Sequence, residues 1–289
     1  MNKILVEGAI DLHVHSYPSL FTRIGDDRTI VGEAVKAGMQ ALVVKCHHES
    51  TVSRAYLLRS EFPTIAIYGG IVLNSFVGGI NPAAVEAALR LGAKVVWMPT
   101  VDAANEAQVY GSTAGYSSKK NNRQTVKGIT IIEEGGLRAD VYEVIELAIQ
   151  HEAILGTGHL FPNEILKLAQ VAKELGLKRL IINHPFFPVP NITSELLQEL
   201  VNLGAVAEMD YCGLSPMWAW GGNSLTKMVE TIKSLKPHNC ILVSDAGQAH
   251  NPMPAEALRI LAQCLYERGV NEGDLRIMML EKPAELLAL

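Results

Sequence analysis

Residues 9–15 of the chain read AIDLHVH, an apolar run that ends in two histidines. The run predicts a β-strand, and successive side chains of a strand point to opposite faces, so His13, His15 and Asp11 share one face. Two imidazoles at the end of one strand suit a divalent metal ion. A single His-x-His pair is a weak signal, so this interpretation depends on whether later strands supply matching ligands.

Composition and charge exclude several classes of function. The 289 residues carry a net charge of −5 and no basic block, which argues against a role in binding nucleic acid. No apolar run has the length of a membrane span and residues 2–6 are too short for a signal peptide, so no membrane partner is expected. Scattered cysteines without C-x-x-C spacing predict reduced thiols and a cytoplasmic location. They are Cys46, Cys212, Cys240 and Cys264.

The chain alternates between segments typical of strands and segments typical of amphipathic helices. Eight strands are predicted, at 9–15, 41–45, 64–73, 93–98, 153–157, 179–183, 205–209 and 240–244. Eight helices are predicted, at 29–37, 53–61, 82–91, 141–150, 162–175, 194–203, 225–235 and 255–268. Eight βα units in a chain of this length predict an α/β fold, a (β/α)8 TIM barrel that forms a single domain over residues 1–289.

A doubly wound parallel sheet is the main structural alternative. Such a sheet commonly carries a glycine-rich phosphate loop after its first strand. Here that position holds His13, His15 and Tyr17 in place of a G-x-G-x-x-G motif. The sequence therefore favours the barrel.

Metal-binding side chains recur where the predicted strands end, which is the end at which barrel enzymes carry their active sites. His159 follows the fifth strand, His184 the sixth and Asp245 the eighth, in addition to His13 and His15 on the first. One histidine in such a place is more often a hydrogen-bonded structural residue. Four histidines and an aspartate at equivalent strand ends indicate a metal site.

These residues resemble the ligand set of the metal-dependent amidohydrolase superfamily, and the resemblance covers the chain from end to end. Residues 282–289 also resemble the last helix of that superfamily. The resemblance implies one or two divalent metal ions bound by His13, His15, His159, His184 and Asp245. It also implies that the ion activates a water molecule and that Asp245 accepts its proton. Zinc is the expected metal, with manganese and iron as alternatives.

The sequence departs from the superfamily pattern after the fourth strand. Members with two metal ions commonly carry a bridging carboxylated lysine or a glutamate there, and residues 95–100, VVWMPT, offer neither. Lys45 at the end of the second strand and Glu208 at the end of the seventh are candidate substitutes, with His47 as a further candidate ligand or substrate contact. A lysine near a strand end is more often paired with a carboxylate, so the number of metal ions stays open.

The charges of the predicted site define a mechanism. A zinc-like ion lowers the pKa of bound water toward ~7 and polarises a carbonyl oxygen. Asp245 would take the proton of that water and pass it to the leaving group, with Lys45 as a second catalytic candidate. Asp11, Glu208 and Asp210 are candidate acceptors for the ring N–H groups of histidine ligands. The predicted function is hydrolysis of a C–N or C–O bond in a small-molecule amide, lactone or ester.

Other functions fit the same residues. A barrel that binds metal but serves in binding or regulation is suggested by the missing ligand after the fourth strand. A phosphoesterase of the histidinol-phosphatase type also begins with His-x-His, and decarboxylation uses the same constellation in the superfamily. The placement of His159, His184 and Asp245 fits an amidohydrolase-like hydrolase better.

Two loops are predicted to shape specificity. Residues 101–139 form a long insertion after the fourth strand, either a lid over the site or a surface loop. Its candidate contacts are Tyr110, Tyr116, Lys119, Lys120 and Arg123. Trp218 and Trp220 after the seventh strand suit a small organic substrate or a contact between subunits, which leaves a homo-oligomer open. Gln248 and His250 after the eighth strand are candidate substrate contacts.

Overall fold

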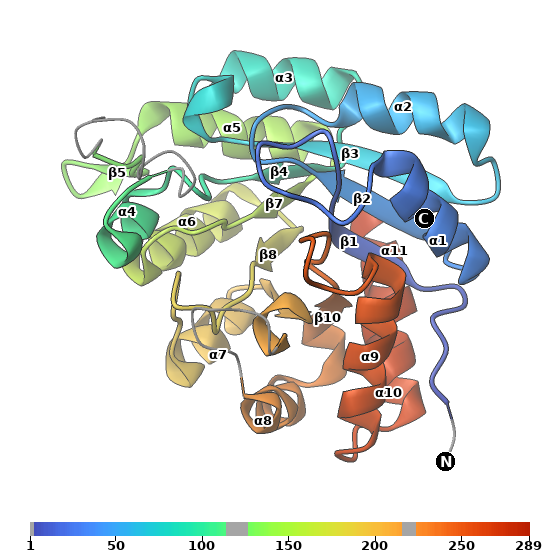
Figure 1. Ribbon diagram of the computed structural model, residues 1–289. Coiled ribbons are helices and arrows are strands. Elements are labelled where there is room, and N and C mark those ends of the chain that lie inside the picture. Colours follow the sequence, from blue (N-terminus) through green and yellow to red (C-terminus); the bar gives the residue numbers. More distant parts are fainter. Residues whose placement is uncertain (1–2, 114–126, 216–223) are drawn as a thin grey trace.

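The computed structural model describes residues 3–113, 127–215 and 224–289. Its centre is an eight-stranded parallel sheet in the order β1-β2-β3-β4-β7-β8-β9-β10, with helices around it (Figure 1). The strands are β1 (Ile10–His15), β2 (Ala41–Lys45), β3 (Ala66–Val72), β4 (Val95–Trp97), β7 (Ile154–Gly156), β8 (Leu180–Ile182), β9 (Val206–Asp210) and β10 (Cys240–Val243). All eight lie within the predicted segments or one residue beyond them, and the predicted (β/α)8 barrel is confirmed.

The helices that follow the eight strands also agree with the predicted pattern. They are α1 (Asp27–Lys36), α2 (Val52–Glu61), α3 (Pro82–Arg90), α5 (Ala139–Gln150), α6 (Pro162–Leu175), α7 (Ser194–Asn202), α8 (Leu225–Leu235) and α9 (Pro254–Tyr266). Local chemistry sets their ends. Asn81 caps α3, since its side chain accepts a hydrogen bond from Ala84 N. Gly176 ends α6 at a φ of 90°, a value that glycine adopts without strain.

Shorter elements complete the chain. They are α4 (Ala104–Tyr110), α10 (Glu272–Arg276), the π-helix η4 (Ile277–Glu281), α11 (Lys282–Leu287) and the 3-10 helices η1 (Ser75–Val77), η2 (Cys212–Leu214) and η3 (Pro237–Asn239). The hairpin of β5 (Ile132–Glu133) and β6 (Gly136–Leu137) lies within residues 101–139, the predicted insertion. Among the described residues, no helix combines the length and apolar character needed to cross a membrane.

Some predicted features lie outside the described residues. Tyr116, Lys119, Lys120 and Arg123 of the predicted insertion are among these, as are Trp218 and Trp220. The described parts of residues 101–139 contain α4 and the β5–β6 hairpin. A lid formed by the insertion stays a prediction.

Contacts between the first and last strands close the barrel. His15 N donates to Ala246 O at 2.8 Å, and Val14 and Ala246 form a parallel bridge. Ser244 N also donates to the Asp11 carboxylate at 3.2 Å. These bonds fix the position of residues that follow β10 relative to the end of β1.

The hydrophobic core consists of two clusters of buried side chains. An outer layer packs between strands and helices, and an inner cluster includes Ile10 and Ile241 of the barrel with Leu286 and Leu287 of α11. Each fully buried leucine or isoleucine contributes about 1.5–3 kcal/mol. The inner apolar cluster extends from the first residues of strands, such as Ile10 and Val95, to Trp97 and Val243 at the ends of β4 and β10. The buried polar side chains of the predicted site follow beyond it, as Asp245 does.

We predict that Gly247→Ala weakens the closure of the barrel. Gly247 has a φ of 133°, and a Cβ atom there would lie 1.9 Å from His15 O. Backbone strain and overlap together should lower the free energy of unfolding by at least about 3 kcal/mol in denaturant titrations.

Gly176→Ala is the matched control. It also has a positive φ, but a Cβ atom there meets nothing within 4 Å, so a loss of about 1–2 kcal/mol is expected. Equal losses for the two variants would contradict the importance of the contact between Gly247 and His15.

Candidate metal centre

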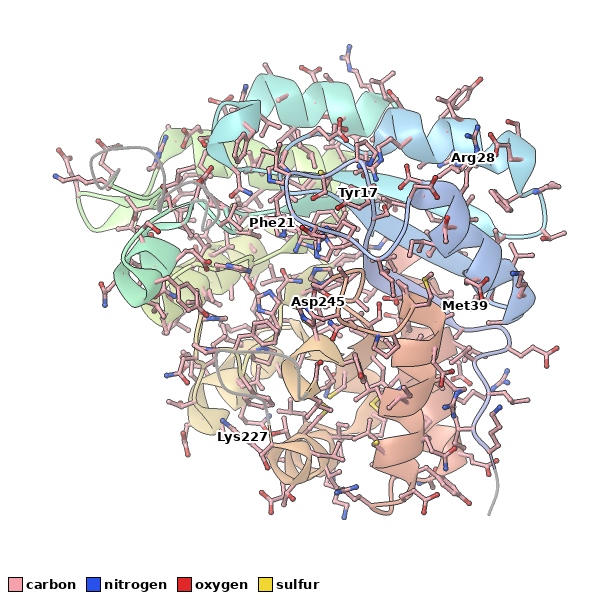
Figure 2. The ribbon with its side chains drawn as sticks, in the orientation of Figure 1. Tyr17, Phe21, Arg28, Met39, Lys227 and Asp245 are labelled. Carbon is pink, nitrogen blue, oxygen red and sulfur yellow. The ribbon has the colours of Figure 1, made fainter. Side chains whose placement is uncertain are left out.

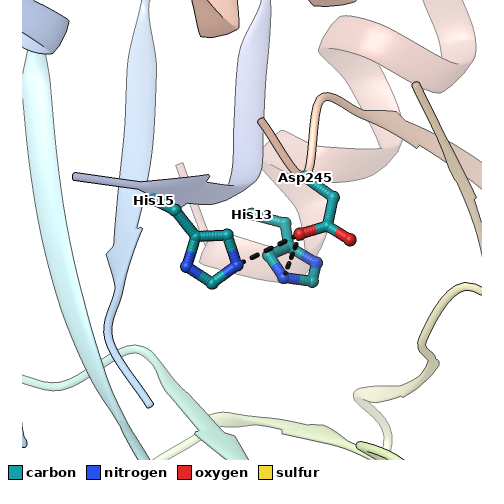
Figure 3. Close-up of side chains that lie close together, drawn as sticks. All are labelled: His13, His15 and Asp245. Atoms are coloured by element: carbon teal, nitrogen blue, oxygen red, sulfur yellow. Dashed lines mark hydrogen bonds and ion pairs between the residues drawn. The ribbon is translucent and has the colours of Figure 1, made fainter. Parts of the chain in front are cut away.

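Three buried side chains meet where β1 and β10 end (Figure 3). Asp245 Oδ1 lies 3.0 Å from His13 Nε2 and 3.1 Å from His15 Nε2. One ligand atom from each residue lies within 4.8 Å of the other two. Two nitrogens and one oxygen in this arrangement form a candidate site for a divalent ion.

The backbone that presents these residues is unusual at two strand ends. Asp245 has a φ of 45° and His184 a φ of 25°, in a region that residues other than glycine rarely adopt. Such conformations cost about 1–3 kcal/mol each and persist where the surrounding structure enforces them. Five other residues besides glycine have a positive φ among the described residues, so this backbone conformation helps to place His184 and Asp245 but does not by itself mark the site.

Glu208 on β9 orients the first histidine. Its Oε1 atom lies 3.0 Å from His13 Nδ1, and its Oε2 atom accepts a hydrogen bond from Asn183 Nδ2 at 2.9 Å. Because a carboxylate can only accept, His13 carries a proton on Nδ1 and turns Nε2 toward Asp245. In this orientation Nε2 would face a metal ion once its own proton is lost.

The other two candidate acceptors bind backbone groups. The Asp11 carboxylate accepts from His13 N at 3.1 Å and from Ser244 N, and Asp210 accepts from Gly213 N. Burial raises the pKa of Asp11 to about 7. Asp11 therefore supports the strand ends and makes no observed contact with an imidazole ring.

His184 and His159 form a second pair beside the first cluster. Their ring centroids lie 4.8 Å apart, and the His184 ring lies 6.1 Å from that of His13. His184 Nδ1 is buried and has no hydrogen-bond partner within the described residues. His159 Nδ1 lies 2.7 Å from Glu106 Oε2, which leaves its Nε2 atom for another partner. A buried nitrogen without a partner is costly, and a cation would satisfy it.

The Lys45 side chain extends from β2 to His13. Its Nζ atom lies 2.9 Å from His13 Nε2 and 5.1 Å from the Trp97 ring centroid. Burial lowers the pKa of Lys45 to about 8. The structure therefore places the lysine predicted to substitute for the missing strand-four ligand beside the candidate metal site.

His47 packs against the ring of His15. The two rings stack with centroids 4.9 Å apart, and His47 Nδ1 lies 2.9 Å from Thr100 Oγ1. Thr100 Oγ1 also accepts from Asn74 Nδ2 at 2.9 Å. The fully buried Thr100 hydroxyl and Asn74 thus fix the orientation of His47.

Burial and neighbouring charges set the protonation of the cluster. Burial holds the pKa values of His15, His47 and His184 well below the ordinary histidine value, so these rings are neutral. Burial opposes ionisation of Asp245, but the charge of His13 and hydrogen bonds from His13 and His15 hold its pKa well below the carboxyl value. Burial likewise opposes the charged form of His13, yet Asp245 raises its pKa to about 9. His13 is therefore protonated at neutral pH, and a divalent ion would take the place of its Nε2 proton. The neutral rings of His15 and His184 and the ionised Asp245 already have the forms that bind metal, so the donors fit a divalent ion.

Sequence comparison assigns the chain to a family. Residues 8–208 match the family of unknown function DUF6282. The chain belongs to this family. No curated protein matches it.

Solved structures show what the DUF6282 chain resembles in fold. An amidohydrolase from Pseudomonas aeruginosa has a TM-score of 0.64 at 13% identity, over 97% of this chain and 95% of that chain. A variant of a PTE-like lactonase from Deinococcus radiodurans has 0.61 at 13%, over 98% and 97%. An amidohydrolase from Burkholderia multivorans has 0.59 at 14%, over 97% and 99%. These structures share the fold of this chain, so the fold that the resemblance implies is confirmed.

Several residues at the site of this DUF6282 protein are not predicted by the sequence pattern. Arg23 lies in the loop after β1, with Nη2 3.2 Å from His15 Nδ1. Glu106 on α4 pairs with His159 from a segment interpreted only as a loop. His250 is exposed, and no contact with the cluster is observed in the described part of the chain, so its role stays a prediction. A strand-end pattern can identify ligands, but it contains no signal for loop residues that fold back.

We predict that the double variant His13→Ala with His15→Ala loses bound metal and keeps its fold. Two of the three converging donor atoms disappear, while the apolar core is unchanged. Elemental analysis of the purified protein measures metal per chain, and circular dichroism reports the fold.

A matched double variant, His151→Ala with His238→Ala, removes two histidines that have no contact with the cluster among the described residues. It should keep its metal. Full metal content in the His13 and His15 double variant would exclude the assignment.

Proposed function

We propose that this protein is a metal-dependent hydrolase that cleaves a C–N or C–O bond of a small-molecule amide, lactone or ester. The observation that carries the proposal is the convergence of His13, His15 and Asp245 at the strand ends of the barrel. The resemblance in fold to proteins described as amidohydrolases and as a lactonase supports it. A small molecule is the substrate class that suits such a site.

The donor set indicates which residues would hold a metal. His13, His15 and Asp245 would bind one divalent ion, and His184 and His159 would complete that site or bind a second ion. Nitrogen and carboxylate donors suit zinc first, with manganese and iron as alternatives. When bound, such an ion supplies Lewis acidity that makes water more acidic and polarises a carbonyl oxygen.

Asp245 is the proposed proton acceptor. Its carboxylate is buried, ionised and held by two histidines, so its position is fixed before substrate arrives. A carboxylate at this place can take a proton from the attacking water and deliver it to the leaving group. Glu208 would not compete for this role, because both of its oxygens already accept hydrogen bonds.

The cysteines support the proposed cytoplasmic location. All four lie in the described residues and are free thiols, and burial raises the pKa of Cys240 to about 12. Thiols that stay reduced and unreactive are typical of proteins in a reducing compartment.

We expect a chelator to abolish turnover of a panel of esters, lactones and amides, and zinc or manganese to restore it. On the substrate so identified, Asp245→Asn should lower kcat by a factor of about 10² to 10⁴, because the amide cannot accept a proton. Turnover and metal content measured on the same samples show whether a fall in kcat comes from the missing proton acceptor or from loss of bound metal.

Two results would contradict this function. Metal bound at the site without turnover of any panel member would favour a binding or regulatory barrel. Near-normal kcat for Asp245→Asn would show that another group moves the proton.

Lys45 is proposed as a part of the metal site. Its Nζ atom contacts His13 Nε2, the same atom that faces Asp245. A positive ammonium group at this distance would oppose a cation on that nitrogen. A neutral or carboxylated amine removes the conflict, and a carboxylated amine would act as an anionic ligand.

We therefore predict that Lys45→Ala lowers the number of metal ions per chain. Lys178→Ala, which removes an exposed lysine, serves as the control and should keep full metal content. Unchanged metal with a raised KM would assign Lys45 to the substrate instead. Wild-type values for both would make it structural.

A further inference from the structure

Arg23 is a buried cation without an acidic partner. The residue is 7% exposed, its Nε donates to Ser19 Oγ at 3.3 Å, and Nη2 lies 3.2 Å from His15 Nδ1. Within residues 3–113, 127–215 and 224–289, no carboxylate forms an ion pair with it. Arg54, which contacts the same loop and has a side chain 12% exposed, pairs with both Asp27 and Glu49.

An unpaired buried charge is costly and needs an explanation. Arg23 stays charged at neutral pH, since burial lowers its pKa only to about 10. The carboxylate that raises the pKa of Arg23 most is Asp245. Its Oδ1 atom, however, already contacts His13 Nε2 and His15 Nε2. The arrangement therefore leaves positive charge beside the candidate metal site.

The loop that carries Arg23 is held in place. Ile24 N donates to Gly247 O at 2.8 Å, and the backbones of Arg23 and Gln248 form a bridge. Arg54 Nη2 donates to Tyr17 O at 3.1 Å, on the other arm of the loop. In the view of Figure 2, Tyr17 and Phe21 of this loop and Asp245 are labelled over the middle of the molecule. A guanidinium fixed in this way loses little entropy on binding.

The hydrogen bond between Arg23 and His15 would be lost if His15 bound a metal ion. An imidazole that holds a cation through Nε2 carries its proton on Nδ1, so it cannot accept a hydrogen bond from Arg23. The Nη2 atom then needs another acceptor, and no hydrogen bond of Nη1 is observed in the described residues. The guanidinium also lies over the Phe21 ring at 5.5 Å, a contact that uses its face and leaves the N–H edge for an acceptor. A planar fork of N–H groups matches the oxygens of a carboxylate or a phosphate.

We propose that Arg23 binds an oxyanionic group of the substrate, a carboxylate or a phosphate, while the bond to be cleaved lies over His13, His15 and Asp245. This inference rests on the proposed function and adds to it the substrate class, an anionic small molecule. Arg23 would then be a specificity-determining residue that acts on the substrate directly.

Calorimetric titration with succinate and with inorganic phosphate tests the binding step. Wild type should bind one of the probes, and which probe binds identifies the anion. Arg23→Gln should weaken that binding by about 10- to 100-fold, as expected for the loss of hydrogen bonds from a charged donor. Arg23→Lys, which keeps the charge without the fork, should lie between the two.

Arg28→Gln is the matched control. It removes one positive charge five residues further along, from an exposed surface pair with Glu61, and should bind the probe as wild type does. Thermal unfolding of each variant shows whether it is folded. Wild-type affinity in folded Arg23→Gln, or no binding of either probe to wild type, would overturn the inference.

A pair of esters with one leaving group separates this inference from the proposed function. In Arg23→Gln, kcat/KM for mono-p-nitrophenyl succinate should fall about 10-fold or more beyond the fall for p-nitrophenyl acetate. Equal falls would show that Arg23 only orients His15, and the hydrolase function would stand. Anion binding that depends on Arg23 without turnover of either ester would instead refute the function and leave the inference intact.

Discussion

The contact between Asp245 and the two histidines of β1 depends on the closure of the barrel. Asp245 and His15 are 230 positions apart in sequence, yet Oδ1 and Nε2 are 3.1 Å apart. Closure brings them together through the bond between His15 N and Ala246 O and through the Asp11 carboxylate, which accepts from both β1 and the residue after β10. Any change that loosens this seam separates the donor atoms, so the stability of the barrel and the geometry of the site share one set of bonds.

The second constraint is the concentration of charge in a buried space. Asp245 and Glu208 are acidic, and Lys45 and Arg23 are basic, all of them at most 7% exposed. Buried charges are tolerated when they are paired or bind an ion. Glu208 is satisfied by His13 and Asn183, whereas Asp245 is shared among several neighbours. A divalent ion and an anionic ligand would together balance these groups.

The sequence predicts the barrel well because burial patterns are local. Runs such as residues 41–44 and 240–243 are apolar over nearly the length of one strand, and Asn81 and Gly176 mark helix ends through their own chemistry. Candidate ligands could be predicted for a related reason, because parallel strands end at one face of a barrel. His13, His15 and Asp245 do lie together at that face.

The remaining features depend on three-dimensional contacts that leave no local pattern. The partnership of Glu106 with His159 joins α4 to a strand end, and the position of Arg23 depends on a loop that pairs with residues after β10. The hydrogen bonds of Asp11 depend on such contacts as well. Its place on the strand face suggested an imidazole partner, but a register shift between Asp11 and Val14 accompanies its use as a backbone acceptor.

Trp97 connects the apolar half of the barrel to the polar half. Its ring lies 6.2 Å from that of His13 and 5.1 Å from Lys45 Nζ. Room for it is provided by glycines on both neighbouring strands, since a Cβ atom at Gly70 or Gly156 would lie 2.5 Å from the indole. Below it, apolar side chains fill the interior. The charged groups thus stand on an apolar floor that excludes water from one side, and a lower local dielectric strengthens every interaction among them. The same floor raises the cost of leaving any of these charges unpaired, which is why the unpaired guanidinium of Arg23 points to an anion from outside the chain.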